Sequence, residues 1–348
     1  MWGLNTIIAL SVASLVGGPH GAAPGTGAAG KAPPKLYSGL CLEDGEIGSK
    51  IRSAADSEAK SFIQHVLGGD VQFAYGQMSV AGKASVTAAQ FASVTQSVVK
   101  SAGPFSKLEV DKTYLVELKG SAPSAICGEL SSPEKWIAVR TAPIARQVYV
   151  TLDAAAPNNG WTITVWMEPE DETWRVRSFA LNISTIAGRS AHDIWSLASA
   201  QARAGHSFNA ALLYGAARGL AARGPNFQLG IQPQILKDMA AAARPPELKG
   251  APPFILSLRG RTYRVSEFTT LGIADKLRLI VKLRPETWTN DAKADLENRA
   301  FLDAFLAARP ELREVYASVV AQAYKPDGTG GFGTVYDVQK GYLAKPAS

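Results

Sequence analysis

The stretch NGWTITVWMEPEDETWRVRSFALN, residues 159–182, decides how the rest of the chain is interpreted. Aromatic and β-branched residues alternate with polar residues on both sides of a short acidic turn that contains Pro169. Two alternating runs joined by a turn are typical of an antiparallel β-hairpin. The stretch therefore predicts two adjacent strands of an antiparallel sheet, and it carries no residue pattern that indicates chemistry by itself.

The two faces of this predicted hairpin differ in composition. Side chains alternate between the faces of a strand, so we expect Trp161 and Trp174 to face a hydrophobic core. The opposite face would carry Trp166, Arg175, Arg177 and Phe179. An aromatic ring beside two guanidinium groups can form cation–π contacts. We interpret Trp166, Arg175 and Arg177 as a contact face, used for homodimer formation or for packing against the helical hairpin expected at residues 190–243.

Length and composition exclude a wholly disordered chain. The 348 residues include 46% hydrophobic residues, and the formal net charge is +6. This length accommodates two or three domains of ordinary size. The excess of 36 basic over 30 acidic residues is too small to indicate a nucleic-acid-binding protein by charge alone.

The beginning of the sequence predicts export. An apolar run at residues 4–16 is too short to span a bilayer but has the length of a signal-peptide core. No Lys or Arg precedes this run, which departs from the usual pattern. We expect residues 1–23 to be a signal peptide and residues 24–48, rich in Gly, Ala and Pro at their start, to be a flexible linker. The mature protein would be periplasmic or secreted.

Cys41 and Cys127 are the two cysteines of the chain. Their spacing matches no zinc motif, so no metal site is expected. Two interpretations stay open: a single Cys41–Cys127 disulfide, which an exported protein would favour, or two buried free thiols.

Three helices are predicted before the strands, at residues 53–67, 70–77 and 87–101. The first has the apolar spacing of an amphipathic helix and ends at two glycines. Further strands are expected at residues 106–118, 136–140 and 146–152, ahead of the hairpin.

This order of elements resembles the nuclear transport factor 2-like superfamily, also called SnoaL-like or cone-fold domains. The resemblance covers about residues 49–183, and the predicted domain is 49–185. It is carried by Phe62-Ile63, Leu67-Gly68-Gly69-Asp70, Ala74-Tyr75, Val148–Leu152, Trp161–Trp166 and Trp174–Phe179. It implies an α+β fold in which a cone-shaped, curved antiparallel sheet is closed by helices over a pocket. Isomerases, dehydratases, binding domains and assembly modules share this scaffold, so the resemblance does not fix a function.

Residues 190–243 are expected to form an α-helical hairpin that resembles one tetratricopeptide repeat. Its cues are Leu197, Ala198, Gly205, Ala210, Tyr214 and Ala217. One such unit cannot bury its own apolar face. We therefore expect the hairpin to pack on a neighbouring element.

Residues 250–340 predict a small C-terminal α+β module. We expect strands at 254–264 and 272–283, amphipathic helices at 290–308 and 311–323, and a closing strand at 334–338. Between residues 244 and 284 there are nine basic and three acidic residues, so this window carries the whole net charge of the chain. Arg259 and Arg261 would share one strand face, which is either a solvated face or a contact with an anionic surface.

Catalytic motifs are weak in this sequence. His65 and Asp70 are the only local pair suited to proton transfer, and we regard them as weak catalytic candidates. No serine-nucleophile motif is present, and no cofactor is expected. Export and the lack of interleaved exposed aromatic residues argue against nucleic acid as a partner.

The sequence therefore favours an exported, non-enzymatic binding or assembly protein with an unknown protein or small-molecule partner. The first alternative is a small-molecule isomerase, dehydratase or hydrolase that uses the cone-fold pocket. A weaker alternative is anchoring at an anionic surface through residues 244–284.

Overall fold

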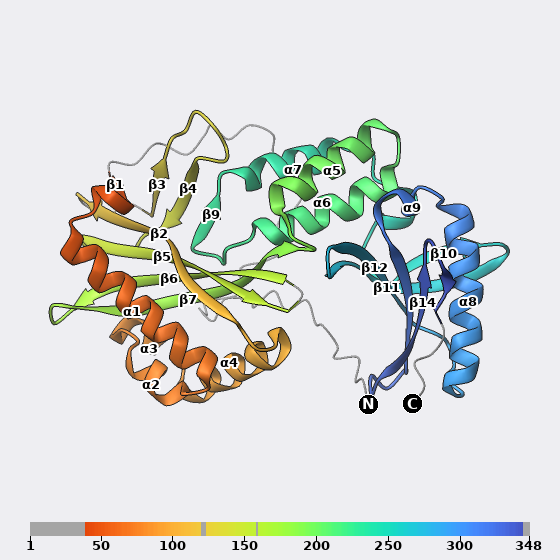
Figure 1. The fold of residues 1–348 in the computed structure, drawn as a ribbon, viewed down its shortest axis with the longest axis horizontal. Coiled ribbons are helices and arrows are strands. Elements are labelled where there is room, and N and C mark those ends of the chain that lie inside the picture. Colours follow the sequence, from red (N-terminus) through yellow and green to blue (C-terminus); the bar gives the residue numbers. More distant parts are fainter. Residues whose placement is uncertain (1–38, 120–122, 158, 344–348) are drawn as a thin grey trace. The chain divides into compact units, whose positions relative to one another are not determined.

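The computed structural model describes residues 39–119, 123–157 and 159–343, which form two compact units (Figure 1). The first unit contains the described residues up to Ser184 together with Ala221–Gln232. The second contains Thr185–Leu220 and the described residues from Pro233 onward. The expected signal peptide, residues 1–23, and most of the expected linker lie outside the described residues.

The first unit is a mixed α+β structure. Its elements are β1 (Gly39–Glu43), the 3-10 helix η1 (Asp44–Glu46), α1 (Ser49–Gly68), α2 (Val71–Gly76), α3 (Val80–Ser85), α4 (Ala88–Ala102), β2 (Lys107–Leu118), β3 (Ser124–Gly128), β4 (Trp136–Arg140), β5 (Arg146–Ala156), β6 (Asn159–Glu170), β7 (Thr173–Ile186) and β9 (Phe227–Leu229). The predicted hairpin of residues 159–182 corresponds to β6 and β7, which confirms its β character.

The main sheet has the strand order β1-β2-β5-β6-β7-β8, where β8 is Arg189–Ser190, and it curls into an antiparallel half-barrel (Figure 1). Helices α1, α2 and α4 cover one of its faces. Phe62 and Ile63 from α1 and Phe91 from α4 are completely buried there, against Ile163 and Val165 of β6. The apolar stripe of α1 thus faces the sheet, as its sequence spacing predicted.

The opposite face of the half-barrel is also covered, by strands of the same unit and not by the helical hairpin that the sequence suggested. A three-stranded sheet of order β3-β4-β9 covers it. Tyr149 and Trp166 are buried beneath this cover together with Phe227 of β9. Alternation along β6 is as predicted, because Trp161, Ile163 and Val165 face the helices and Trp166 faces away. Both faces of β6 are buried, and the chain returns at Ala221–Gln232 to add β9 to the cover.

Phe179 lies on the helix side of β7, which contradicts the predicted alternation. Its ring packs on Phe62 and Phe91, with ring centroids 5.2 and 5.8 Å away. Val176, three residues earlier, belongs to the same core. In a regular strand, residues three apart face opposite sides. Val176 and Phe179 face the same side, so β7 is irregular between them.

The second unit combines a sheet with helices. Its elements are β8 (Arg189–Ser190), α5 (Ala191–Arg203), α6 (Ser207–Ala221), α7 (Ile231–Ala241), the 3-10 helix η2 (Pro246–Leu248), β10 (Phe254–Leu258), β11 (Arg261–Ile273), β12 (Lys276–Leu283), α8 (Asp291–Ala308), α9 (Leu312–Val315), β13 (Ser318–Tyr324), β14 (Gly331–Asp337) and β15 (Gly341–Tyr342).

The second sheet has the order β10-β11-β12-β13-β14-β15. Strands β12 and β13 are parallel, and α8 connects them. The predicted helix at 311–323 was wrong, because only Leu312–Val315 is helical and Ser318–Tyr324 is a strand. Strand β13 lies between β12 and β14 and is buried on both faces. Its sequence is therefore a short apolar run without the two-residue alternation that identifies a half-exposed strand.

Helices α5 and α6 occupy the region of the predicted helical hairpin. Ser190 and Asp193 form a capping box at the start of α5. Phe208 of α6 packs against Phe268 of β11 and Phe305 of α8. The two helices therefore share one unit with the C-terminal sheet and do not form a separate domain. Within residues 39–119, 123–157 and 159–343, no helix has the length and apolar character required to cross a membrane.

Candidate functional site

The second unit contains a cleft of about 680 Å³ at one end of its sheet. Leu283 at the end of β12 and Ala323 near the end of β13 both line it, and so does Asn298 of α8. The cleft thus lies at the carboxyl ends of two parallel strands, beside the helix that connects them. The volume is in the range of small-molecule sites.

Three arginines line the cleft. Arg264 forms an ion pair with Glu286, with 3.8 Å between Nη2 and Oε1. Arg261 and Arg284 are exposed, and neither side chain forms a hydrogen bond or an ion pair with any residue that the structure describes. The backbone N–H of Arg284 donates to the carbonyl of Arg264 at 2.9 Å, which holds these two side chains at the same end of the sheet.

The remaining lining combines hydroxyl groups with an apolar wall. Tyr263 is half-buried, and its ring contacts the ring of Phe301 edge-on at 5.1 Å. The hydroxyls of Thr262 and Thr287 form no hydrogen bond with a described residue. The apolar part consists of Ile255, Leu283, Pro285 and Ala323.

The cleft therefore offers many donors and few acceptors. Glu286 and Glu297 are the acidic residues of its lining, against three arginines. Phosphate and carboxylate groups carry several acceptor oxygens, and guanidinium groups recognise them with paired hydrogen bonds. This donor set suits an anionic molecule that also has an apolar part.

Sequence reasoning found part of this site. Arg261, a predicted contact residue, lines the cleft, whereas Arg259 does not belong to its lining. Arg259 lies in the tight turn between β10 and β11 with a φ of 49°. Arg264 and Arg284 were missed as a pair. The parallel β12–α8–β13 connection could have indicated this site. The sequence analysis did not recognise that connection, because it predicted a helix at 311–323 where β13 lies.

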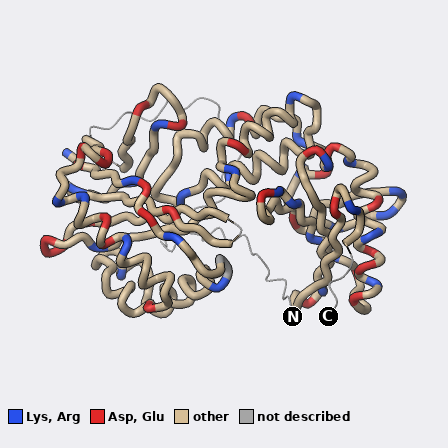
Figure 2. The backbone as a smooth tube through the Cα atoms, in the orientation of Figure 1, with Lys and Arg blue, Asp and Glu red and all other residues tan. Residues whose placement is uncertain are grey.

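Basic and acidic residues are interspersed along both units (Figure 2). Two basic residues of the window at 244–284, Arg278 and Lys282, have partners within the second unit. Lys282 forms an ion pair with Glu267 at 2.8 Å, and the Arg278 side chain donates from Nε to the hydroxyl of Ser318 at 2.7 Å. Among the three cleft arginines, Arg264 forms an ion pair with Glu286. Arg261 and Arg284 form no ion pair with any described residue.

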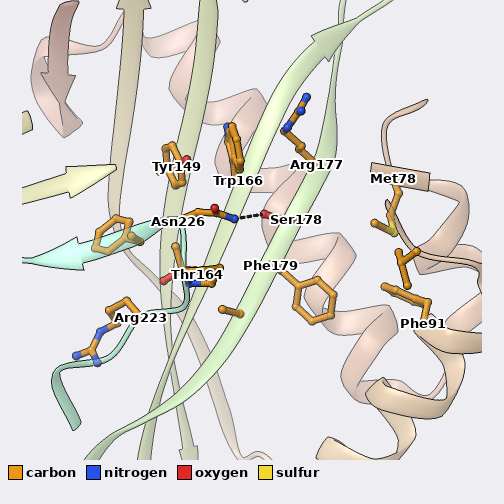
Figure 3. A pocket seen from close by; sticks show the side chains of 14 residues that line it. Met78, Phe91, Tyr149, Thr164, Trp166, Arg177, Ser178, Phe179, Arg223 and Asn226 are labelled. Carbon is orange, nitrogen blue, oxygen red and sulfur yellow. Dashed lines mark hydrogen bonds between the residues drawn. The ribbon is translucent and has the colours of Figure 1, made fainter. Parts of the chain in front are cut away.

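In the first unit, two of the predicted contact residues, Trp166 and Arg177, stack together with Tyr149 (Figure 3). The rings of Tyr149 and Trp166 are stacked at 5.4 Å, and the guanidinium of Arg177 lies 4.9 Å from the Trp166 ring centroid. Arg177 also forms an ion pair with the buried Glu168. Arg175 is half-buried and has no such partner among the described residues. Tyr149 and Trp166 are buried, so this part of the predicted contact face is not an open surface.

A cavity of about 30 Å³ adjoins this stack (Figure 3). The hydroxyl of Thr164 lies in its wall, buried and without a hydrogen-bond partner among the described residues. The volume accommodates about one water molecule. Asn226 closes the cavity by donating to the hydroxyl of Ser178 at 3.2 Å. This space is too small for an organic ligand.

Arg223 lies beside this cavity, on the segment that leads into β9. Burial lowers the pKa of Arg223 to about 10, against the opposing effect of Asp153 and Asp111. Burial and the charge of Asp111 in turn raise the pKa of Asp153, while a hydrogen bond from Thr162 lowers it. Asp153 and Asp111 thus place negative charge close enough to the buried Arg223 to favour its charged form.

His65 and Asp70 are close together, with 3.3 Å between Nδ1 and Oδ2, but both are solvent-exposed in part, at 33% and 56%. Asp70 also accepts a hydrogen bond from the backbone N–H of Phe73 and so caps α2. The ring of His65 packs on the ring of Phe73 at 4.1 Å. The pair has a structural explanation at the junction of α1 and α2.

The space between the helices and the half-barrel is filled by side chains. Phe62, Phe91, Ile163 and Met167 are each completely buried there. A Cys41–Cys127 disulfide joins β1 to β3 outside that core. Among the described residues, no cluster of three or more His, Cys, Asp or Glu side chains is arranged to hold a metal ion.

No protein-family model matches the chain, and comparisons with curated proteins and with solved structures also found no significant match.

Proposed function

We propose that this is an exported, non-enzymatic binding protein whose second unit binds a small organic anion in the cleft at the ends of β12 and β13. The observation that carries the proposal is the pair Arg261 and Arg284. Both guanidinium groups line a cleft of about 680 Å³ without an ion-pair partner among the described residues.

The role of the first unit in this proposal is that of a scaffold. Its curled sheet with helices on one face supports the proposed resemblance to nuclear transport factor 2-like domains. Its interior is filled with apolar side chains, so no observation favours the alternative of an isomerase, dehydratase or hydrolase there. The pairing of α5 with α6 similarly supports, as a proposal, a tetratricopeptide-like helical hairpin.

Export is supported by the Cys41–Cys127 disulfide, because such bonds persist in oxidising compartments. The apolar run near the start of the sequence agrees with this proposal. The signal peptide itself belongs to residues that the structure does not describe.

The binding proposal is tested with phenyl phosphate as a probe, in isothermal titration calorimetry on the full chain. The double variant Arg261→Gln/Arg284→Gln should weaken binding at least tenfold, because two charge-assisted contacts are lost. Arg259→Gln is the matched control, since Arg259 lies outside the cleft lining and should leave the affinity unchanged.

Two outcomes would contradict the proposal. One is equal affinity of the double variant and the unaltered chain for phenyl phosphate. The other is equal affinity of the chain for phenyl phosphate and for neutral benzyl alcohol, because binding would then be driven by the apolar wall alone.

A further inference from the structure

Asn298 of α8 is a buried asparagine whose side-chain carbonyl lacks a hydrogen-bond partner among the described residues. The residue is 0% exposed, and its Oδ1 accepts no hydrogen bond from any of them. An unpaired buried acceptor is costly, because it has lost its bonds to water and gained none in return. Asn298 also lines the arginine cleft, so a molecule bound there can supply the missing donor.

Two hydrogen bonds fix which atom of the Asn298 amide is the oxygen. Nδ2 donates to the carbonyl of Phe332 at 3.0 Å and to the hydroxyl of Thr334 at 3.2 Å. A carbonyl can only accept. The Thr334 hydroxyl donates its one proton to Oδ1 of Asp295 at 2.6 Å, so it also accepts from Asn298. A flipped amide would place oxygen against the Phe332 carbonyl, and the unpaired atom is therefore Oδ1.

The same two bonds place Oδ1 on the cleft side of Asn298. Helix α8 packs over β13 and β14, and both acceptors of Nδ2 belong to β14. The two arms of a planar amide diverge, so Oδ1 is directed away from β14. The cleft lining includes Ala323 of β13 and no residue of β14. The unpaired carbonyl thus lies on the side of the helix where the cleft is.

The two ends of the cleft differ in chemistry. Arg261 and Arg284 are solvent-exposed at one end, whereas Asn298 is buried at the other. The buried Ala323 and the half-buried ring of Tyr263 belong to the same lining and provide apolar surface. A molecule that fills the cleft would place its charge at the arginines, an apolar or aromatic part along this surface, and its far end at an acceptor.

We infer that the anion bound in this cleft carries a hydroxyl or N–H group opposite its charge, and that this group donates a hydrogen bond to Oδ1 of Asn298. The inference rests on the proposed function and names the class of ligand, a hydroxyl- or amino-substituted aromatic anion. A ligand without the donor would leave Oδ1 buried and unpaired. Sites that bond a ligand hydroxyl discriminate strongly against analogues that lack it.

The test compares ligands that differ only in the donor, by isothermal titration calorimetry on the full chain. The probes are the meta and para isomers of hydroxyphenyl phosphate and of methylphenyl phosphate, because a methyl group is similar in size to a hydroxyl but donates no hydrogen bond. In at least one isomer pair, we expect the hydroxyl ligand to bind at least about tenfold more tightly. This comparison uses the unaltered chain and does not depend on the folding of a variant.

Substitution assigns the preference to Asn298. Asn298→Leu should reduce the ratio of the two dissociation constants to within about twofold, since the acceptor is gone. Asn209→Leu is the matched control and should keep the ratio. Asn209 of α6 is also 0% exposed with an Oδ1 unpaired among the described residues, but it lies outside the cleft lining.

A second measurement covers the case in which Asn298→Leu does not fold. The ¹³C resonance of the Asn298 side-chain carbonyl in the unaltered chain should shift when the hydroxyl ligand binds. The methyl ligand should not produce this shift, because it cannot donate to Oδ1. An unchanged resonance with both bound ligands would overturn the inference.

Two further outcomes would overturn the inference and leave the proposed function intact. One is equal affinity within both isomer pairs, which would mean that water satisfies Oδ1. The other is a preference that disappears in Glu297→Leu and persists in Asn298→Leu, which would assign the donor to the exposed carboxylate of the lining. If none of the phosphates bound, the proposed function itself would fail, and the inference with it.

Discussion

The guanidinium of Arg177 lies 4.9 Å from the centroid of the Trp166 ring and forms an ion pair with Glu168, whose carboxylate is buried. This arrangement joins β7 to β6 on the face that β3, β4 and β9 cover. A buried carboxylate requires such a partner, because removing it from water costs several kcal/mol.

Replacing Arg177 by Met should therefore destabilise the first unit. The change leaves Glu168 buried without its charge partner and should lower the free energy of unfolding by about 2–3 kcal/mol. Urea denaturation followed by tryptophan fluorescence measures this difference. Arg175→Met is the matched control, expected to change stability by less than about 0.5 kcal/mol. Adding Glu168→Leu to Arg177→Met should restore part of the loss, and an additive double variant would argue against the pair.

Loss of the Cys41–Cys127 disulfide should lower stability through the unfolded state. The bond closes a loop across a sequence separation of 86, so its removal frees a long segment of the denatured chain. We expect Cys41→Ser/Cys127→Ser to lower the free energy of unfolding by about 2–4 kcal/mol. Urea denaturation with and without dithiothreitol checks this. The reductant should destabilise the unaltered chain by a similar amount and leave the double variant unchanged, and sensitivity of the double variant would contradict this account.

Acid stability should depend in part on Asp193. Hydrogen bonds from the Ser190 hydroxyl, at 2.7 Å, and from the Ser190 N–H, at 2.9 Å, lower the pKa of the Asp193 carboxyl. A carboxyl whose pKa is lower in the folded state stabilises it above the unfolded pKa, near 3.9. That contribution is lost as pH falls through the folded-state pKa.

Thermal unfolding between about pH 3 and pH 7 should consequently show a flatter acid decline for Asp193→Asn than for the unaltered chain. Ser190→Ala removes the other half of the capping box and should lower stability by about 1 kcal/mol at neutral pH. If Asp193→Asn followed the pH profile of the unaltered chain throughout, the capping carboxylate would not be linked to folding.

Two glycine substitutions should change stability in opposite directions. Gly224 has a φ of 89°, and a Cβ at this position would lie 2.5 Å from the Cβ of Ala180. Gly224→Ala should lower the free energy of unfolding by about 1–3 kcal/mol, since both backbone and contact are strained. Gly215 lies within α6 with no atom near its Cβ position, so Gly215→Ala should stabilise by about 0.5–1 kcal/mol. Differential scanning calorimetry distinguishes the two signs.

Residues 311–323 show why part of the candidate site was not predictable. Pro310 and the following acidic residue favour a helix start, and the apolar run that follows has no two-residue period. A strand buried on both faces loses that period because both sets of side chains are apolar. Without β13 there is no parallel pair, so the carboxyl ends of β12 and β13 could not be recognised as the place where Arg261 and Arg284 meet.

The sequence alone determined the features that depend on local spacing. Alternation along residues 159–170 assigned Trp161 and Trp166 to opposite faces of a strand, and the apolar stripe of residues 53–67 assigned α1 to a core. Only the tertiary structure decided what covers each face. Trp166 is buried because Ala221–Gln232 returns from far along the chain to add β9, and contacts between distant segments leave no periodic signal at either one.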